Sequence, residues 1–374
     1  MSILHTITNS VRFSGRPAPF GAALPSRAML PRGMLVGGIL SSAALLVACR
    51  APEAVSAEAA PGSTVKADVG ATPTKVPLAA PRTLPDFCQG ASAVPLPRPV
   101  QVQLIKDGFV FVEGPVWSDK AGAFFFSEMD FNSPGPHGPP SKIQQLVLPA
   151  TVSLFIPASG SNGLAIDAQG LVACTHDTQT LSRYDLTTRQ RSTLVSDVQG
   201  KHFNSPNDVA LHSAGYVYFT DPDWQLPPRQ SETGVTGVYF RNLAGEVRLV
   251  ESSLKEPNGI SLSPDETRLY VGSVDAGISF YELLADGSLG PRQHFADVKE
   301  PDGMAVDCAG RLFVASHGPG EVLVFTPDGA PVATIPVAPK TTNVAFGGAD
   351  RRTLLITAGT GIYSMQSTAP GFPY

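Results

Sequence analysis

The sequence predicts an all-β protein, a six-bladed β-propeller with four-stranded blades, and three observations lead to this prediction. First, only 16% of the 374 residues are charged, while glycine (36) and proline (35) are abundant, and this composition disfavours helical bundles and coiled coils. Second, one sequence pattern occurs six times, at intervals of 41 to 51 residues. Third, no segment with helical periodicity interrupts the copies, which argues against alternating α/β folds.

Each copy of the pattern is typical of a β-hairpin. An acidic or amide residue, usually followed by glycine, precedes a short run in which apolar and polar residues alternate. A turn containing glycine or aspartate follows, and then a second run rich in Val, Phe, Tyr and Leu. Two further strands fit into each interval, and four short strands in roughly 40–50 residues are typical of a propeller blade. The copies begin at Glu113, Asn162, Asn207, Asn258, Asp302 and Asn343.

The first 48 residues resemble a bacterial export signal. They contain four arginines and no acidic residue, and a 15-residue apolar run over 34–48 ends directly before Cys49. A membrane-spanning helix needs roughly 20 apolar residues, so the run fits a signal peptide better. Leu-Val-Ala-Cys at 46–49 resembles a lipobox, which predicts a lipoprotein signal over 1–48 and lipidation of Cys49. Arg50 then implies sorting to the outer membrane, facing the periplasm; the alternative is a plain secretory signal with a chance cysteine.

A change of composition after the signal predicts a linker. Residues 49–95 are rich in Ala and Pro and poor in aromatic residues, so they cannot bury enough apolar surface to offset the entropy of ordering. We therefore expect a disordered tether over 49–95 and the propeller over 96–374. Through residue 95 the net charge is +4, which leaves −9 for the remainder. Such an acidic domain is a poor nucleic-acid binder, and the sequence leaves the oligomeric state open.

The cysteines leave two interpretations. With Cys49 assigned to a lipid, Cys88, Cys174 and Cys308 remain, which is an odd number. One disulfide and one free thiol fit an oxidising periplasm, but the sequence does not say which two residues pair. Alternatively, Cys174 and Cys308 are buried as small apolar residues of the strands.

The six residues that begin the copies form a predicted ring. The first strand of each blade lines the central channel, so residues at the same position of the repeat lie at the same depth in that channel. All six carry side-chain oxygens, on two carboxylates and four amides. Asn-Gly and Asp-Gly are also common turn dipeptides, but these positions precede a strand, and Glu113 fits no turn rule. An all-oxygen ring suits a hard divalent cation, Ca²⁺ first and then Mg²⁺ or Mn²⁺.

The segments around this ring resemble a known family, the senescence-marker-protein, gluconolactonase and luciferin-regenerating-enzyme-like propellers. Asn-Ser-Pro-Asn-Asp and Phe-Thr-Asp-Pro are especially typical of its bacterial gluconolactonase-like branch. The resemblance covers essentially the whole propeller. Its matching segments are Glu113–Trp117, Gly200–Asp208, Tyr218–Pro222, Pro257–Gly259, Pro301–Gly303 and Thr342–Gly348.

The resemblance implies roles for individual residues. Glu113, Asn258 and Asp302 match the family's metal ligands, and Asn207 matches a further ligand or an amide that contacts substrate. Asp302 also matches the carboxylate credited with general-base duty. The implied cofactor is a divalent cation, Ca²⁺ before Mg²⁺, Mn²⁺ or Zn²⁺, although no histidine stands at the ring phase to favour zinc.

Further residues are expected around the substrate. This chain has Lys201-His202 where the family usually has Lys-Arg, and it carries a Pro/Gly-rich insertion at 132–140. His317 follows the second strand of its blade and can reach the pocket, and Trp224 and the insertion are candidates for a lid. The predicted substrate-binding residues are Asn162, His176, Asn207, His202 and Asp221.

These observations together predict a metal-dependent hydrolase that opens a sugar lactone. The metal polarises the carbonyl, a bound water attacks, and Asp302 accepts the proton of that water. No Gly-x-Ser-x-Gly or His-Glu-x-x-His motif is present, so a serine nucleophile or a zincin mechanism has no support. The alternatives are a non-catalytic lipoprotein that binds a sugar or a protein partner at its rim, and a metal-dependent esterase or phosphotriesterase.

Overall fold

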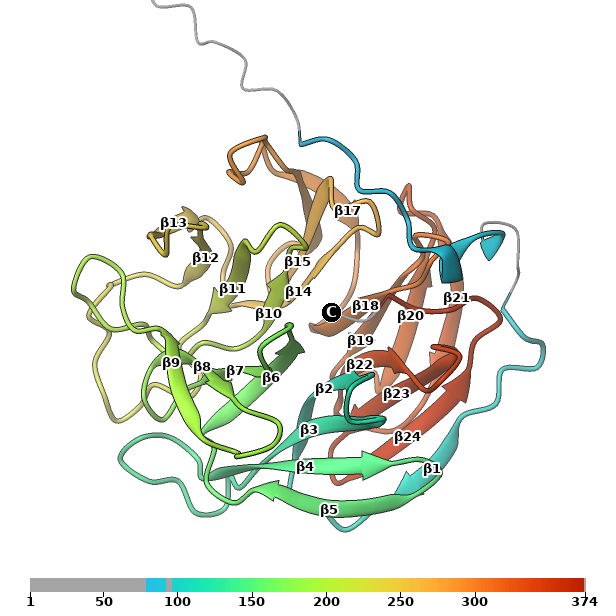
Figure 1. Cartoon of the computed structure of the whole chain (residues 1–374), viewed down its shortest axis with the longest axis horizontal. Helices are drawn as coiled ribbons and strands as arrows, with labels where there is room; N and C mark the ends of the chain where they lie inside the picture. The colour runs from blue at the N-terminus through green and yellow to red at the C-terminus, as the bar shows by residue number, and fades with distance from the viewer. Residues whose placement is uncertain (1–78, 92–95, 373–374) are drawn as a thin grey trace, which may run out of the picture. The chain divides into compact units, whose positions relative to one another are not determined.

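The computed structural model describes residues 79–91 and 96–372 and confirms the six-bladed propeller. Figure 1 shows six antiparallel sheets of four strands arranged around one central axis. Within the described residues the only helix is a single 3₁₀ turn, η1 (Asp86–Cys88), and none is long and apolar enough to cross a membrane.

Each blade is built from strands that follow one another in the sequence, and only the last blade departs from this rule. Blades one to three are β2 (Val112–Ser118), β3 (Ala123–Met129), β4 (Ser141–Val147), β5 (Thr151–Ile156); β6 (Ser161–Ile166), β7 (Leu171–Thr175), β8 (Thr180–Tyr184), β9 (Arg191–Val195); and β10 (Val209–Leu211), β11 (Val217–Asp221), β12 (Gly237–Arg241), β13 (Val247–Glu251). Blades four to six are β14 (Pro257–Leu262), β15 (Arg268–Ser273), β16 (Gly277–Glu282), β17 (Gln293–Ala296); β18 (Pro301–Val306), β19 (Leu312–Ser316), β20 (Glu321–Phe325), β21 (Pro331–Pro336); and β22 (Thr341–Gly347), β23 (Thr353–Ala358), β24 (Gly361–Gln366) with β1 (Gln103–Lys106).

The ring of blades is closed by the first strand of the described residues. β1 pairs antiparallel with β24, with Gln103 opposite Ser364, and so becomes the outer strand of the sixth blade. The sequence analysis did not anticipate this strand. It is only four residues long and is largely exposed, so it lacks the alternating pattern that marks a half-buried strand.

The core lies between neighbouring blades. Six clusters of buried apolar side chains each join two adjacent sheets; the cluster between blades two and three, for example, contains Cys174 of β7 and Phe219 of β11. The ring of Phe203 packs edge-on against that of Phe219, with centroids 5.0 Å apart. Because every blade is packed on both faces, its inner strands are buried along their whole length. The inner strands therefore form a rigid frame for any side chains at the axis.

The first strand of each blade begins at or close to the ring residue. Its pairing with the second strand is irregular at this point in most blades. In five of the six blades the pairing of the first two strands shifts register at this point, for example between Glu113 and Val116 and between Pro301 and Met304. A β-bulge re-aims the side chain that it carries. The irregular pairing therefore recurs beside five of the six ring residues, and the third blade, which carries Asn207, lacks it.

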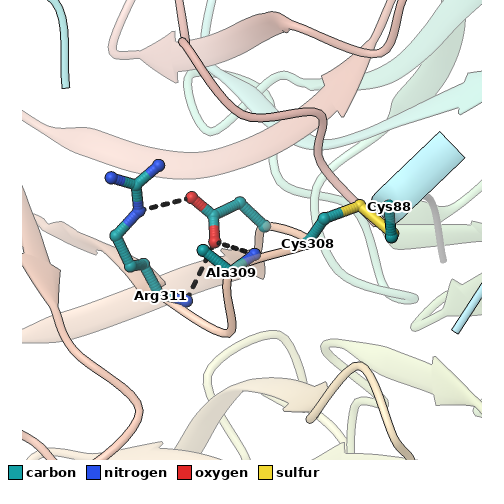
Figure 2. Close-up of a disulfide and its surroundings, with 5 residues drawn as sticks. Cys88, Cys308, Ala309 and Arg311 are labelled. Carbon is teal, nitrogen blue, oxygen red and sulfur yellow. Dashed lines mark hydrogen bonds and ion pairs between the residues drawn. A yellow bond between two sulfur atoms is a disulfide. The ribbon is translucent and has the colours of Figure 1, made fainter. Parts of the chain in front are cut away.

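A disulfide lies on the face of the propeller opposite to the ring residues. Cys308 lies two residues beyond the end of β18, and it is bonded to Cys88 of η1 (Figure 2). The bond settles the pairing that the sequence left open, with Cys174 as a buried free thiol. Figure 2 also shows the adjoining turn, in which Ala309 and Arg311 contact the carboxylate of Asp307.

The strap, which we define as residues 79–91, lies on this same face. The backbone amide of Ala79 donates to the carbonyl of Leu283 at 3.0 Å, and Arg82 pairs with Glu266 at 3.0 Å. The strap belongs to the segment in which we expected a disordered tether. It packs against the propeller because the disulfide and this ion pair supply contacts that composition alone does not reveal.

Candidate active site

Five of the six ring residues line one cavity at the end of the channel. Its volume is about 320 Å³, and the ring residues in its wall come from the start of the first strand in five different blades. The sixth, Asn343, lies deeper and lines a void of about 40 Å³ within the channel. The ring residues of the cavity are Glu113, Asn162, Asn207, Asn258 and Asp302.

Glycines beside the ring allow the inner strands to approach one another closely. A Cβ atom on Gly303 would lie 1.8 Å from the Cγ atom of Asn343, and one on Gly163 would lie 2.5 Å from Oδ1 of Asp208. Neither position tolerates a side chain. The glycine that follows most ring residues therefore leaves space for the next blade: for a polar side chain at Gly163 and Gly303, and for backbone at Gly114 and Gly259.

Two buried carboxylates lie at the floor of the cavity. Glu113 and Asp302 are each only 6% exposed. Burial and the nearby charge of Asp302 raise the pKa of Glu113 well above its usual range. Glu113 accepts a hydrogen bond from the backbone amide of Gly114 at 3.1 Å. In the described residues no lysine or arginine lines this cavity, and the one basic side chain in its wall, His317, contacts Asp302.

His317 contacts the second carboxylate. Its Nδ1 atom lies 3.2 Å from Oδ2 of Asp302, and this hydrogen bond raises the pKa of the imidazole. Burial raises the pKa of Asp302, and His317 counteracts part of that effect. Figure 1 places β19, which ends one residue before His317, next to β18. The imidazole and the carboxylate thus belong to neighbouring strands of one blade.

A third buried carboxylate, Asp208, was not anticipated. It is 7% exposed and lines the small void below the ring, and burial raises its pKa to about 7. Asn343 hydrogen bonds to both Asp208 and Glu113 and lowers the pKa of each. A signal was present in the sequence, because the third copy has aspartate where four of the other copies have glycine after the ring residue.

The donor set at the floor suits a divalent cation. Within residues 79–91 and 96–372, no three side chains of the types His, Cys, Asp and Glu are grouped so that they could hold a metal ion by themselves. The cavity instead combines two carboxylates with amide oxygens, which are ligands that Ca²⁺ accepts. A dipositive ion would also relieve the repulsion between Glu113 and Asp302. By this test the residues fit a metal, with Glu113, Asn258, Asp302 and Asn207 as its candidate ligands.

The other residues predicted to bind substrate are distributed differently. Asn162 lines the cavity, whereas His176, His202 and Asp221 are not among the residues that form it. His176 is fully buried beneath the 132–140 insertion, where its Nε2 atom lies 2.8 Å from the carbonyl oxygen of Pro139. Burial lowers the pKa of its imidazole.

His202 and Asp221 take part in the structure around the third blade. His202 is exposed, and its Nδ1 atom lies 2.9 Å from the carboxylate of Glu232. Asp221 is buried and accepts hydrogen bonds from the backbone amides of Asn204 and Ser205, at 2.9 and 2.8 Å. Burial raises its pKa to about 8. These contacts fix the loop that leads into Asn207.

The upper wall of the cavity is largely apolar. Trp224 belongs to it, as the sequence suggested, and lies in the loop between β11 and β12. The remaining wall residues were not predicted to line the site. Met129 ends β3 and Pro301 begins β18, and the others lie in loops with no repeated pattern: Phe111, Phe131, Gln225, Val274 and Glu300.

Comparisons with known proteins point to one family. The family model described as SMP-30/Gluconolactonase/LRE-like region matches residues 111–360. A gluconolactonase from Zymomonas mobilis is 31% identical over 295 residues, which are 72% of this chain and 82% of that protein. A pentonolactonase from Haloferax volcanii is 26% identical over 257 residues, 67% of this chain and 81% of that protein. Among solved structures, a gluconolactonase from Xanthomonas campestris has a TM-score of 0.65 at 29% identity and covers 78% of this chain and 97% of its own.

Proposed function

Because the chain belongs to the SMP-30/gluconolactonase/LRE-like family, we propose that it is a metal-dependent hydrolase that opens a sugar lactone. Lactone hydrolysis is supported by the relatives, whose names describe lactonases of hexose and pentose type. The observation that carries the metal-dependent mechanism is the grouping of Glu113, Asn258 and Asp302 in one cavity, in whose wall the described residues place no lysine or arginine.

The proposed reaction uses the ring residues directly. When bound by Glu113, Asn258 and Asp302, a divalent cation supplies a Lewis acid for the lactone carbonyl and its developing negative charge. Asp302 accepts the proton of the attacking water, and its hydrogen bond with His317 orients the carboxylate. Asn207 and Asn162, which line the same cavity, donate hydrogen bonds that hold the lactone against the floor.

We propose Ca²⁺ as the cation. Carboxylate and amide oxygens from different blades can satisfy its flexible coordination, whereas Mg²⁺ demands nearly ideal octahedral geometry. Zinc is the least suitable candidate, because its usual ligands are histidine and cysteine. His317 contacts Asp302 at the cavity wall and is not needed as a metal ligand in this arrangement.

The proposal is tested by assaying the purified propeller with glucono-δ-lactone, following acid release in a weak buffer. Activity is expected to disappear after chelation and dialysis and to return on addition of Ca²⁺, because the lone carboxylate pair cannot stabilise the oxyanion. Enzyme treated with chelator and then given an excess of Ca²⁺ over chelator controls for irreversible unfolding. Full activity in the chelated enzyme would refute the metal-dependent mechanism, and inactivity with all lactones would refute the function.

We also propose that the protein is exported and lipid-anchored in the cell envelope through Cys49. Cys49 lies outside the described residues. The Cys88–Cys308 disulfide supports an oxidising compartment, because such bonds rarely persist in a reducing cytosol. In a bacterial host, the wild-type protein is expected in the membrane fraction and the Cys49→Ser variant in the soluble fraction or as uncleaved precursor. Equal fractionation of the two proteins would contradict the anchor.

A further inference from the structure

The mouth of the candidate active site carries an apolar collar, which we define as Phe111, Phe131, Trp224 and Val274. All four line the cavity. Three of them are unusually exposed for large apolar residues: Phe131 by 45%, Trp224 by 41% and Val274 by 47%. A contiguous exposed apolar surface around a polar pocket is typical of a ligand-binding site. The collar is continuous with the floor that holds Glu113 and Asp302, so one ligand can contact both.

The charges of the cavity restrict this ligand further. Glu300 lines the wall in addition to Glu113 and Asp302, whereas no lysine or arginine does so in the part of the chain that the structure describes. One cation bound at the floor would offset the two ring carboxylates but would leave Glu300. The one basic side chain that the described residues place in the wall is His317, and its imidazole already contacts Asp302. An anionic group held near the wall would therefore meet the like charge of Glu300 with no unpaired cation to compensate.

The collar is held in place by contacts between loops. The rings of Phe111 and Phe131 pack edge to face, with centroids 5.2 Å apart. The guanidinium of Arg229 donates to the carbonyl of Gln225 at 2.9 Å and to that of His137 at 3.3 Å. Arg229 thereby joins the loop that carries Trp224 to the 132–140 insertion, which follows Phe131. Aromatic side chains that are already fixed lose little conformational entropy when a ligand covers them.

From this arrangement we infer that the preferred lactone is uncharged and carries an apolar substituent on the carbon bonded to the ring oxygen, with the collar as the binding surface for that substituent. The inference rests on the proposed function. With the carbonyl at the floor, this carbon is separated from it by the ring oxygen, and its substituent extends toward the mouth. Water adds to the carbonyl carbon, the bond from that carbon to the ring oxygen breaks, and the ring oxygen leaves as a hydroxyl that carries the proton.

The test compares δ-lactones that share one ring. The value of kcat/KM is measured for δ-lactones with methyl, propyl and pentyl groups at this carbon, for glucono-δ-lactone and for its 6-phosphate. We expect kcat/KM to rise roughly two- to fourfold for each methylene that the collar covers. The 6-phosphate is expected to react roughly tenfold or more slowly than glucono-δ-lactone.

Variants of the collar show whether the rise in kcat/KM comes from binding to this surface or only from the hydrophobicity of the substrate. Phe131→Ser and Trp224→Ser should flatten the dependence on chain length, so that the loss of kcat/KM relative to the wild type grows from the methyl to the pentyl lactone. Leu243→Ser is the matched control, because Leu243 is 60% exposed and lies in the turn between β12 and β13, away from the cavity. It should preserve the full dependence on chain length.

The possible outcomes are distinguishable. Failure to hydrolyse every lactone, with the wild-type protein folded and supplied with Ca²⁺, would refute the proposed function and the inference with it. Hydrolysis of glucono-δ-lactone without a rise along the alkyl series would overturn the inference alone. A rise that persists unchanged in both serine variants would also overturn it, because the substituent would then bind elsewhere.

Discussion

Replacing Asp302 with asparagine is expected to lower kcat/KM for lactone hydrolysis by about a thousandfold or more. The substitution keeps the size of the side chain but removes its negative charge and its ability to accept a proton. It also removes one of the two carboxylates that fit a divalent cation at the floor of the cavity. The measurement is steady-state hydrolysis of glucono-δ-lactone in excess Ca²⁺, compared with the wild-type protein.

Thermal unfolding provides the control for this prediction. Removing one of two mutually repelling buried carboxylates should not destabilise the metal-free protein. Added Ca²⁺ should raise the unfolding temperature of the wild type, since a ligand at 100 times its Kd stabilises by about 2.7 kcal/mol. The D302N variant should lose this response, and the Asp286→Asn variant, at an exposed position paired with Arg248, should keep it. Wild-type activity in D302N would refute the assigned role.

Removing the disulfide should lower the free energy of unfolding by about 2–5 kcal/mol. The bond joins Cys88 to Cys308 across 220 residues, so it restricts the unfolded chain strongly and also holds the strap on the propeller. The Cys88→Ala/Cys308→Ala double variant is compared with the wild type by denaturant unfolding. Activity under native conditions should change little, because the bond lies on the face opposite to the candidate active site.

Reduction separates the effect of the bond from that of the substituted side chains. A reducing agent should destabilise the wild type and leave the double variant unchanged. Both cysteines are buried, at 3% and 5% exposure, so the substitutions themselves contribute some loss of packing. Equal stability of oxidised and reduced wild type would show that the strap is held by its other contacts.

The fold was predictable because each blade repeats the same local pattern. Alternating apolar residues and turn residues mark a hairpin within a short window, and six copies leave few alternatives. The closing strand β1 and the pairing of Cys88 with Cys308 were not predictable in this way. Both depend on contacts between residues more than 200 positions apart, for which one sequence contains no local signal.

The floor of the candidate site was more predictable than its walls. Glu113 and Asp302 share one phase of the repeat, and that phase brings them into one cavity. The same reasoning did not show which of His176 and His317 lies in the cavity wall, since each directly follows the second strand of its blade. The 132–140 insertion covers His176 and leaves His317 in the cavity wall. Insertions follow no repeat, so their effect on a site requires the three-dimensional structure.

The pairing of β1 with β24 has a consequence for the order in which the molecule can form. β1 is synthesised before all the blades, and its partner is the last strand of the chain. The ring therefore stays open until synthesis has passed Gln366, however early the individual blades acquire their hairpins. Closing it brings together Gln103 and Ser364, which lie far apart in the sequence, and such long-range pairing is a slow step in folding. A chain arranged in this way holds the residues of its cavity in a closed frame only when this last pairing has formed.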